Sequence, residues 1–515
     1  MPRLRLIALF AGALPLAAAL HDPVRVEGGR LSGIAGLNPA VTVFKGIPFA
    51  APPLGDLRWR PPQPAAEWED IRQAARFSAA CMQTPYPAGS LYRLPPEPVS
   101  EDCLYLNVWT AAASPNERRP VMVWIHGGGL TRGSGSARNY DGEELARKGV
   151  VLVTINYRLG AFGFLAHPEL TGESAHHSSG NYGFLDQVAA LEWVHRNIAR
   201  FGGDPNRVTI FGESAGSWSV NLLMATPLAK GLFQRVIGES GADFEPLQKL
   251  SAAEQAGAQF ARSMGAGSLS ALRAKSAADL LAAPGPFSGA IFLGNVDGWV
   301  LPEDVYAIFA AGKQNDAPLL LGSNADEGTA FTPASMTAED FRQLVSRRFG
   351  ARADAYLKLY PAGSDAEARA SEAASIRDRT FGWEMRTWAR MQARTGKSKV
   401  YLYYFSRVPP GPAGAVYRAY HAAEITYVFH NLGLSDRPWE AVDRTLSDSM
   451  SSYWVNFATS GDPNGQDLLK WPAYDEKTDL VMGLGNQIEV RPAPYKAALD
   501  FFDDWFTNLH NASGR

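Results

Sequence analysis

The nine residues VTIFGESAG (208–216) decide the fold class and organise the rest of the sequence. Four β-prone residues run into Gly212, and Ser214 then lies between two glycines. A strand that ends in G-x-S-x-G and continues as a helix makes a sharp, strained turn, which holds the serine hydroxyl clear of the sheet. Glycine is needed on both sides because a Cβ would collide with the crowded backbones of strand and helix. The stretch therefore predicts a nucleophilic serine at the end of a buried strand.

The sequence around this turn alternates short apolar runs with helical patterns. Buried strands are predicted at 121–126, 150–158, 208–211, 235–240, 317–323 and 399–405. Between the second and the third of these, apolar residues recur at the period of a helix that ends at Gly202 and Gly203. Strands that alternate with helices imply an α/β fold whose mostly parallel sheet is covered on both faces. Two Ala-rich helical segments, 244–290 and 334–398, are predicted as insertions over one end of the sheet.

The chain of 515 residues opens with a pattern typical of a secretory leader. Arg3 and Arg5 precede an apolar stretch of 14 residues, 6–19. This stretch ends in three alanines, which supply the small-residue pattern at which such leaders are cleaved. We therefore predict a signal peptide over 1–19 and a single domain over 20–515. The mature protein is expected to be secreted or periplasmic.

Charge and composition exclude several partners. The net charge is −3, from 49 basic and 52 acidic residues, and no long basic run occurs, so a nucleic-acid partner is not expected. After the leader no stretch reads as a membrane span, so stable membrane insertion is not expected either. The sequence contains no CxxC and no HExxH, and no metal site is predicted. It carries no signal for an oligomeric state.

A serine hydroxyl is a poor nucleophile without a histidine base, and this histidine needs a carboxylate partner. In hydrolases of this architecture the chain order is serine, acid, histidine. Three histidines follow Ser214, namely His421, His430 and His510. His421 lies between a helix-breaking GPAG stretch and an apolar run, as expected of a loop residue after a strand. It is the preferred base, because His430 follows the apolar run and His510 is close to the chain end.

The acid and the oxyanion donors are expected in loops that follow predicted strands. Asp326 and Glu327 both come just after the strand at 317–323, and their positions alone leave the choice open. A glycine run at 127–129 follows the strand at 121–126 and lets the backbone pass close to a substrate. The N–H groups of Gly128 and Gly129, together with that of Ala215, are the predicted oxyanion donors.

Several longer motifs resemble those of the type-B carboxylesterase family of α/β-hydrolases, which also contains the cholinesterases and the bacterial p-nitrobenzyl esterases. The motifs are FKGIPFAAPPLGDLRWRPP (44–62), SEDCLYLNVW (100–109), NYRLGAFGFL (156–165), GNYGFLDQ (180–187), FGGDPNRVTIFGESAG (201–216), GNVDGWVLP (294–302), DEG (326–328) and FATSGDPNG (457–465). They cover nearly the whole chain after the leader. The resemblance implies an α/β-hydrolase fold with helical insertions over an active-site gorge. It also implies hydrolysis of small-molecule carboxylic esters without a metal or an organic cofactor.

The same resemblance assigns individual residues. It selects Glu327 over Asp326 as the acid and supports His421 as the base. It also implies a disulfide between Cys81 and Cys103, which a lone cysteine pair in an exported protein favours as well. Two residues next to the reacting groups are expected to support the site. These are Ser240, which resembles a serine that hydrogen-bonds near the family's active site, and Glu213, which precedes the nucleophile.

The chain departs from the family pattern at a few positions. Leu130 follows the glycine run where an aromatic residue or alanine is usual, and is a candidate substrate contact. Ala422 follows His421 where glycine is frequent. Residues 82–102 contain no tryptophan of the kind that holds a quaternary ammonium group in cholinesterases, so choline esters are not expected. The non-catalytic adhesion proteins of the family lack the serine nucleophile, which is present here as Ser214.

The preferred substrate is predicted only in outline. The Ala-, Leu- and Phe-rich inserted segments favour an apolar gorge and medium-sized neutral esters. Arg132, three residues after Gly129, raises the alternative of an ester that carries a carboxylate. A solvated surface arginine or an internal ion pair is the simpler interpretation of Arg132. A lipase or an amide-cleaving hydrolase with the same catalytic groups is the remaining alternative.

Overall fold

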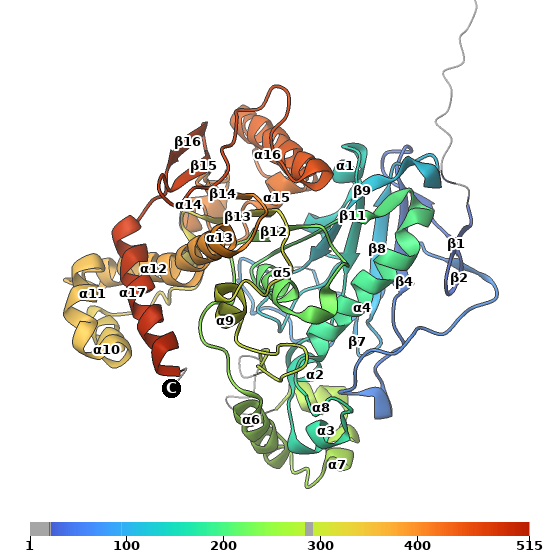
Figure 1. Cartoon of the computed structure of the whole chain (residues 1–515), viewed down its shortest axis with the longest axis horizontal. Helices are drawn as coiled ribbons and strands as arrows, with labels where there is room; N and C mark the ends of the chain where they lie inside the picture. The colour runs from blue at the N-terminus through green and yellow to red at the C-terminus, as the bar shows by residue number, and fades with distance from the viewer. Residues whose placement is uncertain (1–19, 21, 94, 284–291, 514–515) are drawn as a thin grey trace, which may run out of the picture.

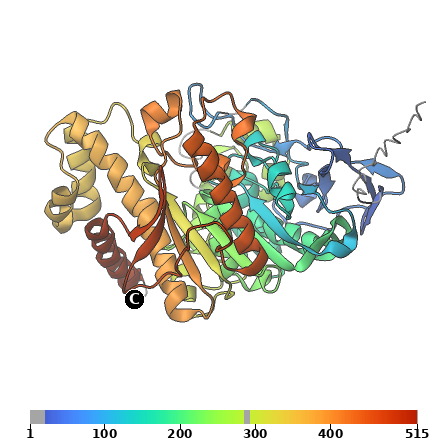
Figure 2. The same cartoon turned by 90° about the horizontal axis from the view of Figure 1, so that it is seen from above.

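The computed structural model describes residues 20, 22–93, 95–283 and 292–513. The signal peptide predicted over 1–19 lies outside the described residues, as do positions 284–290 of the first Ala-rich segment. The described chain is built on an 11-stranded sheet in the order β16-β15-β14-β13-β12-β11-β9-β10-β8-β4-β3. Strands from the two ends of the described chain form the opposite edges of this sheet (Figure 2).

The centre of the sheet is parallel, as the alternation of strands and helices predicts. Its strands are β10 (Val151–Ile155), β9 (Arg119–Ile125), β11 (Gly203–Glu213), β12 (Arg235–Glu239), β13 (Leu319–Asn324), β14 (Val400–Phe405) and β15 (Leu480–Leu484). The α/β fold and all six predicted strands are confirmed. β11 begins at Gly203, earlier than the predicted 208, because its first residue already pairs with Arg119 of β9.

Antiparallel strands extend the sheet at both edges, and the sequence patterns did not predict them. They are β8 (Tyr105–Thr110), β4 (Thr42–Pro48) and β3 (Ile34–Ala35) at one edge and β16 (Ile488–Pro492) at the other. Smaller sheets contain β1 (Val24–Val26), β2 (Gly29–Ser32) and β5 (Ile71–Gln73), and β6 (Ala80–Cys81) with β7 (Val99–Ser100). The strands of the smaller sheets, of two to four residues, are too short for an apolar run to mark them.

Two hydrophobic clusters cover the two faces of the sheet. Side chains of a strand point alternately to opposite faces, so Val121 and Val123 belong to one cluster and Met122 and Trp124 to the other. The helices α4 (Tyr182–Asn197), α5 (Ala215–Ala225) and α13 (Trp383–Thr395) pack on the first face. The helices α1 (Glu143–Arg147), α15 (Ile425–Val428) and α16 (Ala441–Ser460) pack on the second (Figure 1).

The two Ala-rich segments are helical as predicted, but they do not lie together over one end of the sheet. The first forms α6 (Leu250–Ser263), α7 (Leu269–Arg273) and α8 (Ala277–Leu281). The second forms α10 (Ala338–Phe349), α11 (Ala353–Leu359), α12 (Asp365–Ile376) and α13. The two groups lie in different parts of the molecule, and α13 packs against β13 and β14 (Figure 1). Among the described residues, no helix is both long and apolar enough to cross a bilayer.

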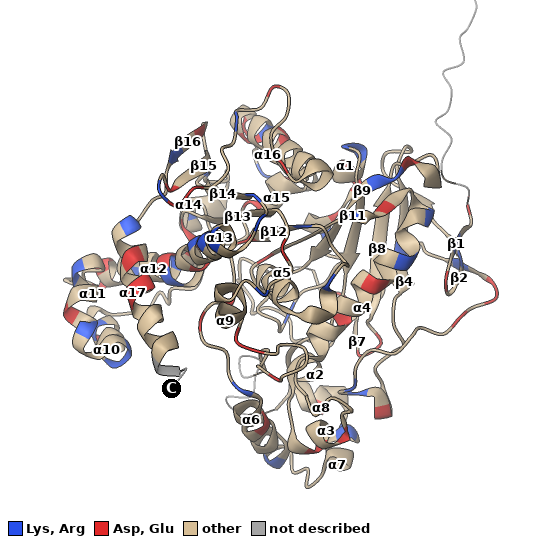
Figure 3. Ribbon diagram, in the orientation of Figure 1, with Lys and Arg blue, Asp and Glu red and all other residues tan. Residues whose placement is uncertain are grey.

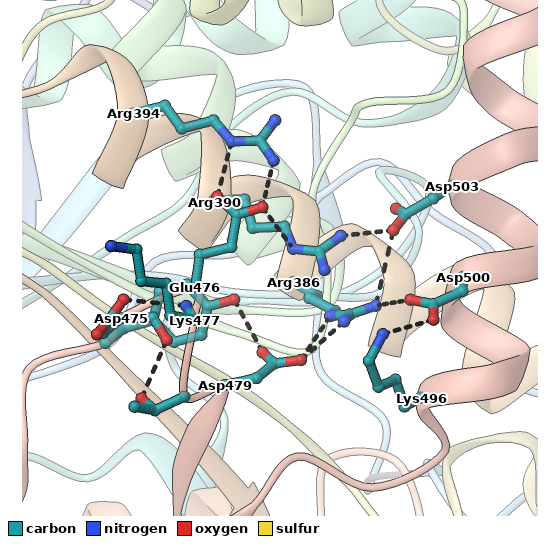
Figure 4. Close-up of polar contacts among 12 residues, drawn as sticks. Arg386, Arg390, Arg394, Asp475, Glu476, Lys477, Asp479, Lys496, Asp500 and Asp503 are labelled. Atoms are coloured by element: carbon teal, nitrogen blue, oxygen red, sulfur yellow. Dashed lines mark hydrogen bonds and ion pairs between the residues drawn. The ribbon is translucent and has the colours of Figure 1, made fainter.

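The C-terminal helix α17 (Lys496–Ser513) is attached to α13 by a chain of ion pairs, which we call the α13–α17 network. Three arginines of α13 face carboxylates of α17 and of the segment before β15 (Figure 4). Arg386 lies 2.7 Å from Asp479 and 2.9 Å from Asp500. The other pairs are Arg390 with Asp503, and Arg394 with Glu476. Figure 3 shows residues of both charges along these outer helices.

Candidate active site

The predicted nucleophile elbow lies at the carboxyl end of β11. Ser214 joins β11 to α5 with φ 57° and ψ −124°, a conformation that few non-glycine residues adopt. A Cβ on Gly212 would lie 2.5 Å from the carbonyl carbon of Gly216, and a Cβ on Gly216 would lie 2.0 Å from the carbonyl oxygen of Ile125. These clashes explain why glycine flanks the serine.

Glu327 and His421 meet at the same end of the sheet. Glu327 opens η7 (Glu327–Ala330) just after β13, and His421 lies in the loop that follows α14 (Pro412–Tyr417). His421 Nδ1 is 2.6 Å from Glu327 Oε2, and Glu327 Oε1 accepts the backbone N–H of Asn324 at 2.7 Å. With both oxygens engaged, the buried carboxylate fixes the ring and leaves Nε2 toward the cavity side as the basic nitrogen.

The alternative acid and the alternative histidines have other contacts. Asp326 Oδ2 accepts the backbone N–H of Ala419 at 3.1 Å, so this carboxylate orders the loop before His421. His430 contacts the hydroxyl of Ser447, and His510 contacts the carbonyl of Phe244. None of the three lines the cavity at Ser214.

The serine and the histidine line one cavity without a hydrogen bond between them. Within the described residues Ser214 Oγ has no hydrogen-bond partner, whereas His421 Nε2 lies 3.0 Å from Glu213 Oε1. The contact between His421 Nε2 and Glu213 Oε1 does not have hydrogen-bond geometry, because Glu213 Oε1 has no hydrogen-bond partner among the described residues. Catalytic hydrogen bonds are often long in the absence of substrate and tighten in the reactive complex.

Buried glutamates surround this histidine. Glu213 and Glu239 are register partners on β11 and β12, and Glu424 Oε2 accepts a hydrogen bond from the side-chain amide of Asn324. Burial, followed by the nearby charges of Glu327 and Glu239, raises the pKa of Glu213 well above its ordinary value. Burial likewise raises the pKa of Glu239 to about 8 and that of Glu424 well above the ordinary range. These shifts favour the neutral form of the three carboxyls, and Glu327 is the acid in contact with Nδ1 of His421.

Sequence reasoning missed two members of this cluster. Glu424 follows His421 by three residues, and Glu239 precedes Ser240 as Glu213 precedes Ser214. The repeated G-E-S at 212–214 and 238–240 was a usable signal, since parallel neighbouring strands bring identical positions side by side.

The glycine run after β9 faces the elbow. Gly128 and Gly129 have φ of 106° and 64°, which favour glycine, and the hydroxyl of Tyr157 donates to the carbonyl of His126 at 2.8 Å. Among the described residues no acceptor takes the N–H of Gly128 or of Gly129. Ala215 begins α5, and its N–H has no partner within the helix. These donors are available to an anionic oxygen near Ser214.

A cavity of about 650 Å³ contains Ser214, His421 and the glycine run. Its apolar walls come mainly from aromatic side chains of distant segments. These are Tyr86, Tyr92, Trp218, Phe331 and Phe381. Of the two inserted helical segments, only the second reaches the cavity among the described residues, through positions 376, 380 and 381. A cavity of this size takes a small organic molecule.

Comparison with known proteins agrees with this arrangement. The profile of the Carboxylesterase family matches residues 21–502. The chain belongs to the carboxylesterase family. It is 40% identical to a fumonisin B1 esterase of Sphingopyxis macrogoltabida, over 93% of this chain and 90% of that protein. It is 37% identical to a para-nitrobenzyl esterase of Bacillus subtilis (92% and 97%) and to carboxylesterase 1D of Rattus norvegicus (90% and 89%). This carboxylesterase is thus a carboxylic ester hydrolase with the α/β-hydrolase fold.

The predicted disulfide of this carboxylesterase is confirmed. Cys81 and Cys103 are joined, with their Cα atoms 5.0 Å apart. The loop between them supplies Tyr86 and Tyr92 to the cavity wall. The hydroxyl of Tyr92 donates to the carbonyl of His421 at 3.3 Å, so the loop also contacts the backbone of the base.

The structure accounts for three further residues that the sequence analysis singled out. Leu130 has φ 58° and is buried in the core, and it does not line the cavity, so the expected substrate contact is not made. Ser240 is also fully buried, but its hydroxyl has no partner among the described residues, so the expected hydrogen bond is absent and the side chain only packs at the strand end. Ala422 has φ 70°, which explains the family's frequent glycine there.

Proposed function

We propose that this carboxylesterase cleaves its esters in two steps through an acyl-enzyme on Ser214. Ser214 Oγ attacks the ester carbonyl carbon while His421 Nε2 takes the hydroxyl proton, which then passes to the departing alcohol. Water, deprotonated by the same nitrogen, attacks the acyl-enzyme and releases the acid. Glu327 orients the ring through Nδ1 and stabilises the imidazolium.

The oxyanion of each tetrahedral intermediate is assigned to the N–H groups of Gly128, Gly129 and Ala215. These donors cost no reorganisation during the reaction because the backbone already holds them, and each is worth about 10²–10³ in turnover. The raised pKa of Glu213, near Nε2, favours a neutral carboxyl beside the reacting serine. The proposal is carried by one observation, the contact of His421 Nδ1 with buried Glu327 beside the strained Ser214.

Ser214→Ala tests the nucleophile. We expect turnover of p-nitrophenyl butyrate to fall about 10⁴-fold or more, with the thermal unfolding midpoint nearly unchanged. A fluorophosphonate probe should add its mass to the tryptic peptide with Ser214. Ser263→Ala, on the outer helix α6, is the matched control and should be labelled and active as the wild type is. An active or labelled Ser214→Ala protein would reject the assignment.

We further propose that the protein is exported and that residues 20–515 form a single domain after removal of 1–19. The basic and apolar pattern of the leader supports export, as does the Cys81–Cys103 disulfide, which persists in an oxidising compartment. Expression of the full chain in a Gram-negative host should yield periplasmic protein that begins near Leu20 or His21 by N-terminal sequencing. A product that retains Met1 and stays in the cytoplasm would contradict export.

A further inference from the structure

Three arginines line the cavity that contains Ser214 and His421. They are Arg132, Arg138 and Arg437. Within the described residues none of them has a carboxylate within 4.0 Å. Exposed arginines elsewhere in the molecule do pair with acids, for example Arg196 with Glu27 and Arg394 with Glu476. The arginines of the cavity are thus cations without a partner of opposite charge.

The two less exposed arginines are held in place by neutral groups. Arg132 donates from Nε to the carbonyl of Thr84 at 3.1 Å and from Nη2 to its hydroxyl at 3.2 Å, and its guanidinium lies 5.2 Å from the ring of Tyr86. These contacts leave Nη1 without an acceptor among the described residues. A guanidinium has five N–H donors, so a second, charged acceptor can still be bound.

Arg437 is held in a similar way on another wall of the cavity. Its Nη2 donates to the hydroxyl of Tyr420 at 2.8 Å, and its guanidinium lies 5.9 Å from the ring of Tyr420 and 5.7 Å from that of Trp439. The Nε and Nη1 groups of Arg437 have no acceptor among the described residues. Aromatic faces hold a guanidinium without neutralising it, so both arginines keep their charge for a ligand.

A single acidic residue of the described cavity lining faces these three cations. Glu213 is the one acidic residue in the described lining, and it is buried below Ser214. Burial, followed by the nearby charges of Glu327 and Glu239, raises the pKa of this carboxyl well above its ordinary value and so favours its neutral form. The free cavity therefore carries an excess of positive charge beside a hydrolytic site, which attracts anionic substrates and repels cationic ones.

We propose that this cavity selects esters that carry a free carboxylate in addition to the scissile ester bond, and that Arg132 and Arg437 determine this preference. The proposal rests on the proposed function, because it concerns the substrate of the same site. It replaces the neutral medium-sized ester as the preferred substrate class. The carboxylate belongs to the acyl half or to the alcohol half of the ester, and the two positions are separated by experiment.

Matched ester pairs test the preference in the wild-type enzyme, with the released acid titrated in a pH-stat at pH 7.5. Monoethyl adipate against ethyl hexanoate places the carboxylate on the acyl half, and 4-acetoxybutyrate against butyl acetate places it on the alcohol half. We expect kcat/KM to favour the anionic member of at least one pair about tenfold or more at low ionic strength, and less at 0.5 M NaCl. Ratios of one or below in both pairs would overturn the proposal.

Arg132→Gln and Arg437→Gln test the residues separately, so that one misfolded variant does not end the experiment. Each should reduce kcat/KM for the preferred anionic ester about tenfold, mainly through KM, and change that for its neutral partner less than twofold. Arg132→Lys should retain part of the preference. Arg347→Gln, an exposed arginine of α10 with no ion pair among the described residues, is the control for net charge.

The outcomes separate this inference from the proposed function. If both glutamine variants lose activity equally on charged and neutral esters, or keep the wild-type ratio, the arginines do not select the substrate. Ser214→Ala should abolish hydrolysis of both esters in every case. Hydrolysis of the anionic ester that survives in Ser214→Ala would reject the proposed function itself, irrespective of the arginines.

Discussion

Two regions of this carboxylesterase collect carboxylates, and they treat the charge in opposite ways. Beside His421, three glutamates are buried without any arginine, and burial raises the pKa of Glu239 to about 8. In the α13–α17 network every carboxylate meets an arginine or a lysine (Figure 4). There the hydrogen bond from Arg394 lowers the pKa of Glu476 below its ordinary value.

The difference indicates separate purposes. Buried acids that lack a cationic partner destabilise the folded protein when they ionise. A cluster of such acids is therefore typical of a functional site, as it is beside His421. Compensated acids near the surface hold one helix to another at small cost and take no part in the reaction. Substitutions in the two regions should therefore affect different measurements, and the following variants test this from the largest effect to the smallest.

Glu327→Gln should have the largest effect and act on turnover alone. The amide keeps the shape but cannot stabilise the imidazolium, so kcat should fall about 10⁴-fold while the unfolding midpoint moves little. Asp326→Asn is the matched control, since this neighbouring acid caps the loop before His421, and should retain activity within about tenfold. Steady-state kinetics on p-nitrophenyl butyrate decide the result. Equal losses in the two variants would show that Glu327 has no special role.

Glu239→Gln should change how stability depends on pH. The folded-state pKa of Glu239 is raised to about 8, so its contribution is fully present below the unfolded value near 4.5 and is lost as pH rises through 8. Wild type should lose on the order of a few kcal/mol of unfolding free energy from this source, and the variant should not. Urea unfolding followed by tryptophan fluorescence between pH 5.5 and 9 measures the difference. Parallel curves would contradict the raised pKa.

Arg386→Gln should weaken the network without affecting turnover. Its side chain is only 3% exposed, and its loss leaves Asp479 and Asp500 without their shared partner. Because these acids are themselves partly solvated, we expect about 2–3 kcal/mol of destabilisation, below the full cost of a broken buried pair. Thermal unfolding and kcat of the folded variant are the measurements. A large drop in kcat with intact folding would mean that the two regions are coupled.

Arg394→Gln should have the smallest effect. Its side chain is 61% exposed, and an ion pair of this kind contributes less than about 1 kcal/mol and is screened by salt. The difference from wild type in urea should shrink further at 0.5 M NaCl. A loss as large as that of Arg386→Gln would indicate that the network acts as one unit rather than as separate pairs.

Local patterns predicted the centre of the fold. The short apolar runs of β9, β10 and β11 are typical of strands that are buried on both faces of a sheet. The two glycines around Ser214 predict the sharp turn that follows β11. Chain order and the common end of parallel strands predicted an acid near His421 from the loop after β13, whereas the resemblance to the family selected Glu327 over Asp326. Each of these inferences uses contacts within a strand or between equivalent strand ends.

What the sequence did not provide depends on long-range packing. Glu424 joins the cluster only because the loop after α14 converges on β11 and β12, and no local pattern encodes that convergence. Leu130 points into the core because its backbone turns left-handed after the glycine run. The helices α6 and α10 also lie in different parts of the molecule (Figure 1). Their Ala-rich composition predicts that they are helical, but it does not predict which part of the fold each of them packs against.

Of the three Gly-Glu-Ser tripeptides of the chain, those at 212–214 and 238–240 lie in register at the ends of β11 and β12, and their serines have nearly the same φ of 57° and 56°. A motif search scores the two copies as close equivalents. Only Ser214 opens a helix beside a cavity, whereas Ser240 is sealed with 0% exposure. Both serines thus share the strained backbone conformation, but only Ser214 is accessible from the cavity. A probe that reacts with serine hydroxyls should therefore label Ser214 and leave Ser240 unlabelled.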